Sequence, residues 1–443
     1  MVEKSVELSL ILDFFIDMAH STRMKLIIPI EYYRSGGVER VIISLIEEFS
    51  KNIEQIIIVL PKKDIYYFQK ILPSSESIVY ESFVPTKNML LSFLRILISG
   101  SKIFKIKQLE KKIKKFRNQQ SKHNALNGLI EKYQATHCLY VLTNRLTPPN
   151  LKIPLGMIAH DVFWRFAPMT YPEDYVREYD QSLLVWLKKS DLVFTVSEKT
   201  KTDIISVFPG FSSKIKPIPN AGVAIRKTER DRETTVNSSH LITFYFPSSF
   251  GIYKDHLTLL RSGIRVAQKK LQFQVVLTGK ETDALVNGRL SLSQQSSTQE
   301  YSNYLNQCHQ VYSENRDVIE QYFNGLGYGE YEQVEYWYQH CSCVIIPSQY
   351  EGFGLALSEA ISRGLPVIAS DLEVFQEQVR LYQCFDQVEF FPPGDAEALA
   401  ACMERFVHHP KSKLNPEKTQ EKLSLWTWKD AAQQYISLLE SIV

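Results

Sequence analysis

Hydrophobic residues along this chain gather in short runs, separated by longer segments in which apolar positions recur with helical spacing. The runs Lys25–Ile30, Leu155–Ala159 and Cys343–Pro347 are nearly continuous, which is typical of strands buried on both faces of a parallel sheet. Strands that alternate with helices predict α/β domains built on doubly wound parallel sheets. The other predicted strands are Gln55–Leu60, His137–Leu142, Asp191–Val196, Leu241–Phe246, Phe273–Leu277 and Pro366–Ala369.

Two domains are expected because the predicted strands fall on either side of residues 226–240, a stretch that is highly charged and poor in apolar residues. A chain of 443 residues is long enough to form two cores. The predicted domains are 24–225 and 241–425, joined by this linker. Residues 1–23 precede the first predicted strand, and the sequence leaves open whether they form an added amphipathic helix or reflect a misassigned start codon.

The segment Pro347–Glu359 contains the densest group of residues suited to ligand binding. A buried strand ends there, a turn with Gly352 and Gly354 follows, and a helix is predicted to begin near Gly354 and to stop at Gly364. Ligands of parallel sheets bind where strand C-termini meet helix N-termini. Glycines let backbone N–H groups approach a ligand, and a helix N-terminus favours a negatively charged group such as a diphosphate.

Two carboxylates belong to the same segment. Glu351 lies in the turn, where it can accept hydrogen bonds from sugar hydroxyls. Glu359 follows about two helical turns later, too far along the helix to cap it. It can accept from both hydroxyls of a ribose, as acidic residues do in dinucleotide sites. An ordinary βαβ unit with solvated glutamates would explain Gly364, but it would not explain two carboxylates and two glycines around one loop.

These residues also carry a resemblance to a known family. Glu351 and Glu359, with seven residues between them, lie in the pattern S-x-x-E-G-F-G-L-x-L-x-E-A-x-x-x-G-x-P-V-I-A-S, which resembles the signature of glycosyltransferase family 4. The resemblance implies a retaining enzyme that uses a nucleotide sugar and has the GT-B fold, in which two Rossmann-like domains face each other across a cleft. It also implies that residues 426–443 form a helix that crosses back to the first domain. Glu351 is then catalytic, and the implied donor-binding residues are Glu351, Gly352, Phe353, Gly354, Leu355 and Glu359.

A further glycine pair follows the first predicted strand, in the sequence Gly36-Gly37-Val-Glu39-Arg40. A strand, a glycine turn and a helix form a phosphate-facing arrangement in outline, although the full dinucleotide fingerprint is missing. In family 4 a turn of this kind closes over the donor phosphates and faces the acceptor. The resemblance therefore implies donor contacts for Gly36 and Gly37 and an acceptor-side position for Glu39 and Arg40. The alternative is a tight turn followed by a solvated Glu–Arg pair.

His160 and Asp161 come directly after a predicted strand, and a histidine at that end of a parallel sheet faces the cleft. His160 can exchange hydrogen bonds with a sugar hydroxyl, although a lone histidine is more often a structural hydrogen-bonding group. The pair resembles the inter-domain segment of the family. This implies that His160 is a catalytic residue that binds the transferred sugar, rather than a general base, and that Asp161 lies on the acceptor side.

Lys254 and Ser249 lie in the segment that follows the first strand of the second domain. In the family a basic pair at this place binds the donor diphosphate, and Lys254 matches its lysine, whereas Ser249 stands where many members carry arginine. The segment resembles mannosyltransferase-like members, which makes GDP-mannose the first expected donor and a UDP-sugar the second. A lysine is a compact charge that suits a diphosphate and the developing charge of a leaving group. The alternative is a surface lysine after a strand.

Composition limits the partners. The net charge of +2 gives no indication of a nucleic-acid partner. No Asp-x-Asp triplet occurs, so neither a metal-held diphosphate nor another cofactor is expected. The six cysteines are sparse and unpatterned, and several fall in apolar runs, which indicates buried, reduced thiols in a cytoplasmic protein. No apolar stretch reaches the length of a membrane span.

One segment nevertheless predicts binding to an anionic membrane surface. Residues 89–98 are nearly all apolar, and residues 101–117 hold eight lysines and arginines against one acid, Glu110. Apolar residues recur within 101–117 at helical spacing and form a stripe, so a basic amphipathic helix is predicted, as in interfacial anchors. Such a helix would place the enzyme beside a lipid-linked acceptor. The alternative is an ordinary helix whose stripe packs on the first domain.

Other functions remain as alternatives. One is a different enzyme of the same fold, such as a sugar-nucleotide epimerase or a phosphorylase. Release of free nucleotide only when an acceptor is present would argue for transfer and against such an enzyme. A Rossmann dehydrogenase is disfavoured because the dinucleotide fingerprint is missing. A non-catalytic binding protein would tolerate the loss of Glu351 or Lys254. Residues 281–320, rich in Ser, Gln and Asn, are predicted to be an exposed insertion with a helical second half.

Overall fold

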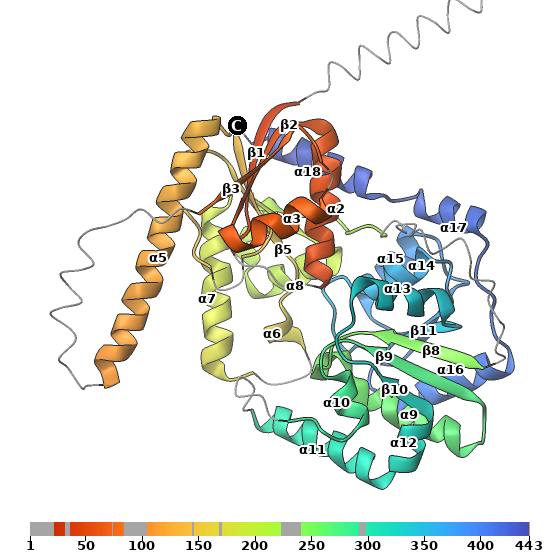
Figure 1. The fold of residues 1–443 in the computed structure, drawn as a ribbon. Coiled ribbons are helices and arrows are strands. Elements are labelled where there is room, and N and C mark those ends of the chain that lie inside the picture. The colour runs from red at the N-terminus through yellow and green to blue at the C-terminus, as the bar shows by residue number, and fades with distance from the viewer. Residues whose placement is uncertain are drawn as a thin grey trace, which may run out of the picture.

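A computed structural model shows two α/β domains, each built on its own parallel sheet (Figure 1). The structure describes residues 22–31, 36–72, 74–83, 104–143, 146–167, 171–222, 241–291 and 298–442, without the side chains of 22–23 and 104–118. The fold class predicted from the alternation of strands and helices is confirmed.

The first domain contains a seven-stranded parallel sheet in the order β3-β2-β1-β4-β5-β6-β7. Its central strands are buried on both faces, which explains why they read as continuous apolar runs. Ile56, Ile57 and Ile58 of β2, for example, are fully buried. The strands are β1 (Thr22–Pro29), β2 (Ile53–Leu60), β3 (Ile78–Ser82), β4 (His137–Tyr140), β5 (Leu155–Ala159), β6 (Leu192–Thr195) and β7 (Ile215–Pro217).

The second domain contains a six-stranded parallel sheet in the order β10-β9-β8-β11-β12-β13. The order reverses between β8 and β11, which is the point at which doubly wound sheets bind ligands. The strands are β8 (Ile242–Pro247), β9 (Phe273–Thr278), β10 (Phe323–Gly325), β11 (Cys343–Ile346), β12 (Val367–Ser370) and β13 (Val388–Phe391).

Helices connect the strands of both sheets. The helices of the first domain are α2 (Gly37–Asn52), α3 (Ile65–Ile71), α5 (Phe104–Tyr133), α6 (Phe163–Phe166), α7 (Glu173–Lys189) and α8 (Glu198–Val207). Those that follow are α9 (His256–Gln268), α10 (Thr282–Val286), α11 (Gln299–Glu314), α12 (Arg316–Tyr322), α13 (Tyr331–His340), α14 (Leu355–Ile361), α15 (Glu373–Leu381), α16 (Ala396–His408), α17 (Pro416–Leu423) and α18 (Trp428–Glu440). Short 3-10 turns occupy Lys62–Asp64, Pro209–Lys214 and Ile252–Lys254.

Helix α18 leaves the second domain and packs on α2 of the first, as predicted (Figure 1). Thr427 and Asp430 form a capping box that fixes the start of the helix. Tyr435 is buried in the core of the first domain, where its ring contacts Phe49 and Phe194 at centroid distances of 6.1 Å and 4.6 Å. The helix therefore completes a core whose other members come from residues far earlier in the sequence.

The prediction for residues 281–320 was right about the helical second half and wrong about exposure. Helices α11 and α12 pack on α9, and the hydroxyl of Tyr304 accepts a hydrogen bond from the backbone N–H of Leu257 at 3.1 Å. Leu305, Cys308 and Ile319 are buried in the core of the second domain. The apolar positions suffice for this packing although polar residues dominate the composition.

Several other predictions fall outside the described part of the chain. Residues 1–21, the linker 226–240 and the apolar segment 89–98 are not described. Helix α5 begins at Phe104, so the backbone of much of the basic segment is helical, but the side chains that would form its apolar stripe are not described. Within the described residues, no helix combines the length and the apolar character needed to cross a membrane. All six cysteines are buried and none forms a disulfide.

Candidate active site

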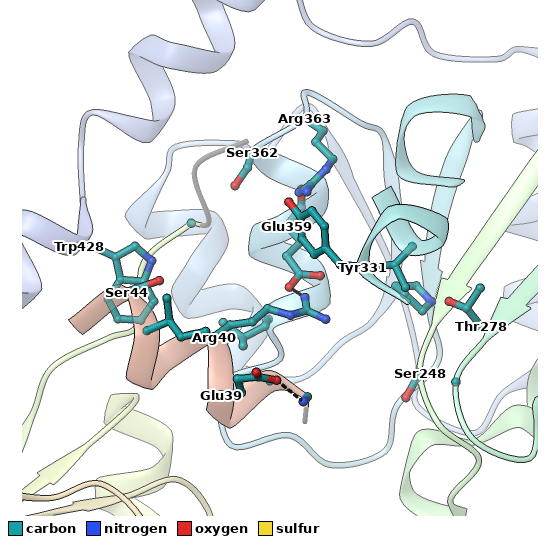
Figure 2. A pocket seen from close by; sticks show the side chains of 18 of the residues that line it. Glu39, Arg40, Ser44, Ser248, Thr278, Tyr331, Glu359, Ser362, Arg363 and Trp428 are labelled. Carbon is teal, nitrogen blue, oxygen red and sulfur yellow. Dashed lines mark hydrogen bonds and ion pairs between the residues drawn. The ribbon is translucent and has the colours of Figure 1, made fainter. Parts of the chain in front are cut away.

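A cavity of about 1520 Å³ lies between the two domains. The C-terminal ends of β8 and β9 reach it from the second domain, and helix α2 borders it from the first (Figure 2). Its volume exceeds the roughly 300–1,000 Å³ of most small-molecule sites. Eight of the predicted site residues line it: Gly36, Gly37, Glu39, Arg40, Ser249, Lys254, Leu355 and Glu359.

Lys254 and Glu351 form an ion pair at one end of the cavity. The ammonium group of Lys254 lies 2.6 Å from Oε1 of Glu351, and the hydroxyl of Ser348 donates to the same oxygen at 2.8 Å. Burial alone would lower the pKa of Lys254, but the Glu351 carboxylate and the nearby Tyr253 outweigh burial and raise that pKa above its ordinary value. Lys254 therefore stays charged, and Glu351 holds it in place.

Glu359 projects from α14 into the middle of the cavity (Figure 2). Only 3% of the residue is exposed. Its Oε2 accepts a hydrogen bond from the hydroxyl of Tyr338 at 2.7 Å, and its Oε1 pairs with the guanidinium of Arg40. Arg40, predicted to lie on the acceptor side, thus reaches across the cleft to the carboxylate predicted to hold the donor ribose.

Both glycines of the turn are required by contacts within the protein. Gly354 has φ +83°, and a Cβ there would lie 2.3 Å from Cε1 of Phe375. A Cβ on Gly352 would lie 2.0 Å from the carbonyl oxygen of His160 in the first domain. The absence of side chains was predicted to admit a ligand; close packing accounts for it without one. Helix α14, with seven residues, is also short for a strong dipole.

The same turn is inserted into the first domain. The hydroxyls of Ser197 and Thr200 donate to the carbonyl of Gly352 at 2.7 Å and 3.0 Å. Phe353, predicted to bind the donor, is 5% exposed, and its side chain packs in the core of the first domain. In this arrangement Phe353 fixes the turn and does not face the cavity.

His160 and Asp161 lie where the domains touch, outside the large cavity. Nε2 of His160 is 2.8 Å from the carbonyl of Val141, and burial lowers the pKa of this imidazole, which is therefore neutral at pH 7. Burial raises the pKa of Asp161 to about 6, against the opposing effect of Lys254. One ring nitrogen of His160 is thus engaged by the backbone, and Asp161 neighbours the Lys254–Glu351 pair. Among the described residues no group of three or more His, Cys, Asp or Glu side chains gathers as a metal site.

Comparison with known proteins agrees with this geometry. Residues 227–423 match the family model of the group 1 glycosyl transferases. The second domain is therefore similar to the group 1 glycosyl transferases. The match covers the cavity residues Ser249, Lys254 and Glu359, as well as Glu351.

Two curated relatives and one solved structure extend the comparison. The chain is 24% identical over 255 residues to the uncharacterized glycosyltransferase MJ1607 of Methanocaldococcus jannaschii, covering 57% of this chain and 61% of the relative. It is 25% identical over 244 residues to O-antigen chain mannosyltransferase B of Escherichia coli, covering 55% and 58%. The matches thus span less than two thirds of each relative. Sucrose-phosphate synthase from Thermosynechococcus elongatus superposes with a TM-score of 0.63 at 15% identity, over 95% of this chain and 99% of that one. The architecture is the GT-B fold.

The sequence did not reveal three residues of the second domain that lie around Glu359: Tyr338, Arg363 and Glu335. Tyr338 belongs to a helix rich in Tyr and Trp, and neither that composition nor helical spacing distinguishes it from its neighbours. Arg363 lies four residues after Glu359, at a position that the sequence pattern leaves unspecified. The available sequence signal was Arg363, a charged residue four positions after a carboxylate predicted to bind a ligand.

Proposed function

We propose that this protein is a glycosyltransferase that moves a sugar from a nucleotide-sugar donor to a glycan or lipid-linked acceptor. The observation that carries the proposal is the position of Lys254 and Glu359 on one inter-domain cavity, at the ligand-binding edge of the second sheet. A cation and a buried carboxylate in one cleft suit the diphosphate and the ribose of a single donor. The acceptor would bind from the side of the first domain.

The donor we propose is GDP-mannose, with a UDP-sugar as the second candidate. Support comes from the 247–256 segment and from the curated name of the E. coli relative, a mannosyltransferase. Lys254 would contact the diphosphate, and Ser249, with the neighbouring backbone amides, would supply neutral donors in place of a second cation. We propose that no metal ion is needed, because Lys254 can balance the charge of the leaving group.

The proposed reaction retains the anomeric configuration. The acceptor oxygen forms a bond to the anomeric carbon on the same face from which the phosphate oxygen departs, and the acceptor proton passes to that phosphate oxygen. Lys254, kept charged and oriented by Glu351, stabilises the negative charge that grows on the diphosphate. In this account Glu351 acts through Lys254, and no carboxylate attacks the sugar.

The direct test is a thermal-shift panel of nucleotide sugars, followed by transfer assays with the donors that stabilise the protein. Lys254→Ala should lower kcat by more than it weakens donor binding, because the charge that it meets is larger in the transition state. Glu359→Ala should weaken nucleotide binding by about tenfold or more. Activity should survive EDTA. A requirement for added Mg²⁺ or Mn²⁺, or nucleotide release without an acceptor, would contradict the proposal.

We also propose that residues 89–117, which include the start of helix α5, bind an anionic membrane surface. The charge pattern of residues 101–117 supports this, since each basic side chain near such a surface contributes about 1 kcal/mol. Wild-type protein should co-sediment with anionic vesicles and not with neutral ones. Changing Lys111, Lys112, Lys114 and Lys115 to Glu should abolish binding. Equal sedimentation of both proteins would mean that the segment is an ordinary surface helix.

A further inference from the structure

Two buried acidic residues, one on the cavity wall and one on another helix, share Arg363 as a hydrogen-bonding neighbour. Glu359 of α14 and Glu335 of α13 are 3% and 4% exposed. Two buried carboxylates cost considerable free energy unless each has partners. The two carboxylates have different partners, and the partners of Glu359 determine how its carboxylate can bind a ligand.

Arg363 forms its ion pair with Glu335 and reaches Glu359 through the backbone carbonyl. Its guanidinium side chain is 7% exposed, and two of its nitrogens, Nε and Nη2, bind the two oxygens of Glu335 in a fork. Nη1 donates to the backbone carbonyl of Glu359 at 2.8 Å. Arg363 therefore binds α13 to the end of α14 and fixes the main chain that carries Glu359.

Tyr338 connects this pair to the carboxylate. Its ring lies between two neighbours: the guanidinium carbon of Arg363 is 4.5 Å from the ring centroid, and Tyr245 meets the ring at 5.2 Å with an interplanar angle of 89°. The hydroxyl donates to Oε2 of Glu359 at 2.7 Å. Burial raises the pKa of Tyr338, so its proton remains in place throughout the neutral range.

We infer that Tyr338, held against Arg363, is a positioning residue that sets the rotation of the Glu359 carboxylate for the two hydroxyls of the donor ribose. The inference rests on the proposed function, because it requires a ribonucleotide donor. A carboxylate bound on one oxygen by a rigid phenol presents its other oxygen to the cavity in one orientation. The guanidinium of Arg40 pairs with that oxygen in this structure (Figure 2). The ribose would take the place of Arg40, with no reorientation of Glu359.

The test compares GDP with 2′,3′-dideoxy-GDP, and UDP with its dideoxy analogue, by calorimetry on the full-length protein. Wild type should prefer each ribonucleotide over its dideoxy form. Tyr338→Phe keeps the ring and removes the donor, so it should weaken ribonucleotide binding about fivefold to tenfold and leave dideoxy binding unchanged. Arg363→Lys keeps the charge and loses the planar fork, and it should act in the same direction.

A matched control is Tyr435→Phe, which removes the hydroxyl of a buried tyrosine in the first domain that has no hydrogen-bond partner among the described residues. It should change neither affinity. Equal weakening of ribonucleotide and dideoxy binding by Tyr338→Phe would overturn the inference, because a purely structural role predicts that result. Equal affinity of wild type for both forms would also overturn it, while sugar transfer in the same preparation would leave the proposed function standing. Failure of every nucleotide and nucleotide sugar to bind would overturn both.

Discussion

At the scale of single residues, a direct ionic partner decides which charged groups near the cleft keep their charge. Lys254 is half-buried beside Glu351 and remains an ammonium, whereas Asp161, a close neighbour of both, has a pKa raised to about 6. The difference arises because Lys254 has a direct ionic partner and Asp161 has only a weak hydrogen bond, 3.5 Å long, from the backbone of Phe163. Neither state could be read from the sequence, because both depend on tertiary contacts: Lys254 contacts Glu351 within the second domain, and Asp161 is buried where the two domains touch.

Asp161 makes stability depend on pH in an unusual direction. Because the folded-state pKa is raised from 3.8 to about 6, the folded protein holds more protons than the unfolded chain between these values, so this residue destabilises the fold as the pH rises through that window. Asp161→Asn carries no such charge. The melting temperature of the variant should therefore rise relative to wild type between pH 4.5 and pH 7, with a free-energy difference on the order of 2 kcal/mol. A constant free-energy difference between the two proteins across this range would show that folding does not raise the pKa of Asp161.

At the scale of elements, the sequence predicted the interior of each sheet and missed the edges. The predicted strands coincide with β1, β2, β4, β5, β6, β8, β9, β11 and β12, give or take a few terminal residues. The four strands that no apolar run predicted, β3, β7, β10 and β13, lie at sheet edges. Most of their residues are only half buried or exposed, so their sequences lack the continuous apolar run on which prediction relied.

The candidate site was predicted only in part, as the sheets were. Lys254 and Glu359 were found because a local pattern surrounds them, and the structure puts both on one cavity. Tyr338 belongs to α13, and only tertiary packing brings it to Glu359, whereas Arg363 lies in the turn after α14, four residues beyond Glu359. Phe353 shows that a motif can also mislead. Its place in the motif suggested a ligand contact, whereas its side chain packs in the core of the first domain.

Helix α18 offers a prediction about packing. Leu439 is fully buried, and its Cδ2 fills the space above Gly156 of β5, 3.1 Å from where a Cβ would lie. Leu439→Ala should cost about 2–5 kcal/mol of stability in the first domain, because it removes buried methyl groups and leaves a cavity. Urea unfolding should show the transition of that domain shifted to lower denaturant. Leu425→Ala, at a position that is 46% exposed, is the control and should shift little. Equal shifts would mean that α18 contributes little to that core.

At the scale of the whole molecule, one turn of the second domain connects the two halves. Gly352 touches His160, and Phe353 enters the core of the first domain, so this turn sets how far the cleft is closed. Glu351 and the inter-domain contact at Gly352 are therefore adjacent parts of a single loop, and movement of one domain would move that loop.

Gly352→Ala tests that connection. The added methyl would collide with the backbone oxygen of His160, which cannot move aside as a flexible side chain could. We expect the domains to separate slightly and transfer activity to fall by about a hundredfold, as misplacement by about 1 Å can cause, while nucleotide binding to the second domain persists. Small-angle scattering should report a larger radius of gyration. Gly210→Ala, where a methyl meets nothing within 4 Å, is the control. An unchanged radius and unchanged activity would show that the contact is dispensable.

The return of α18 to the first domain also has a consequence for synthesis. Residues 22–217, which contain the whole first sheet, leave the ribosome before any strand of the second sheet. Their core nevertheless lacks Trp428, Ala431, Tyr435 and Leu439 until α18 has been translated. The core of the first domain is therefore completed only after the second domain has been translated. During that interval the apolar residues of α2 that α18 covers are open to chaperones.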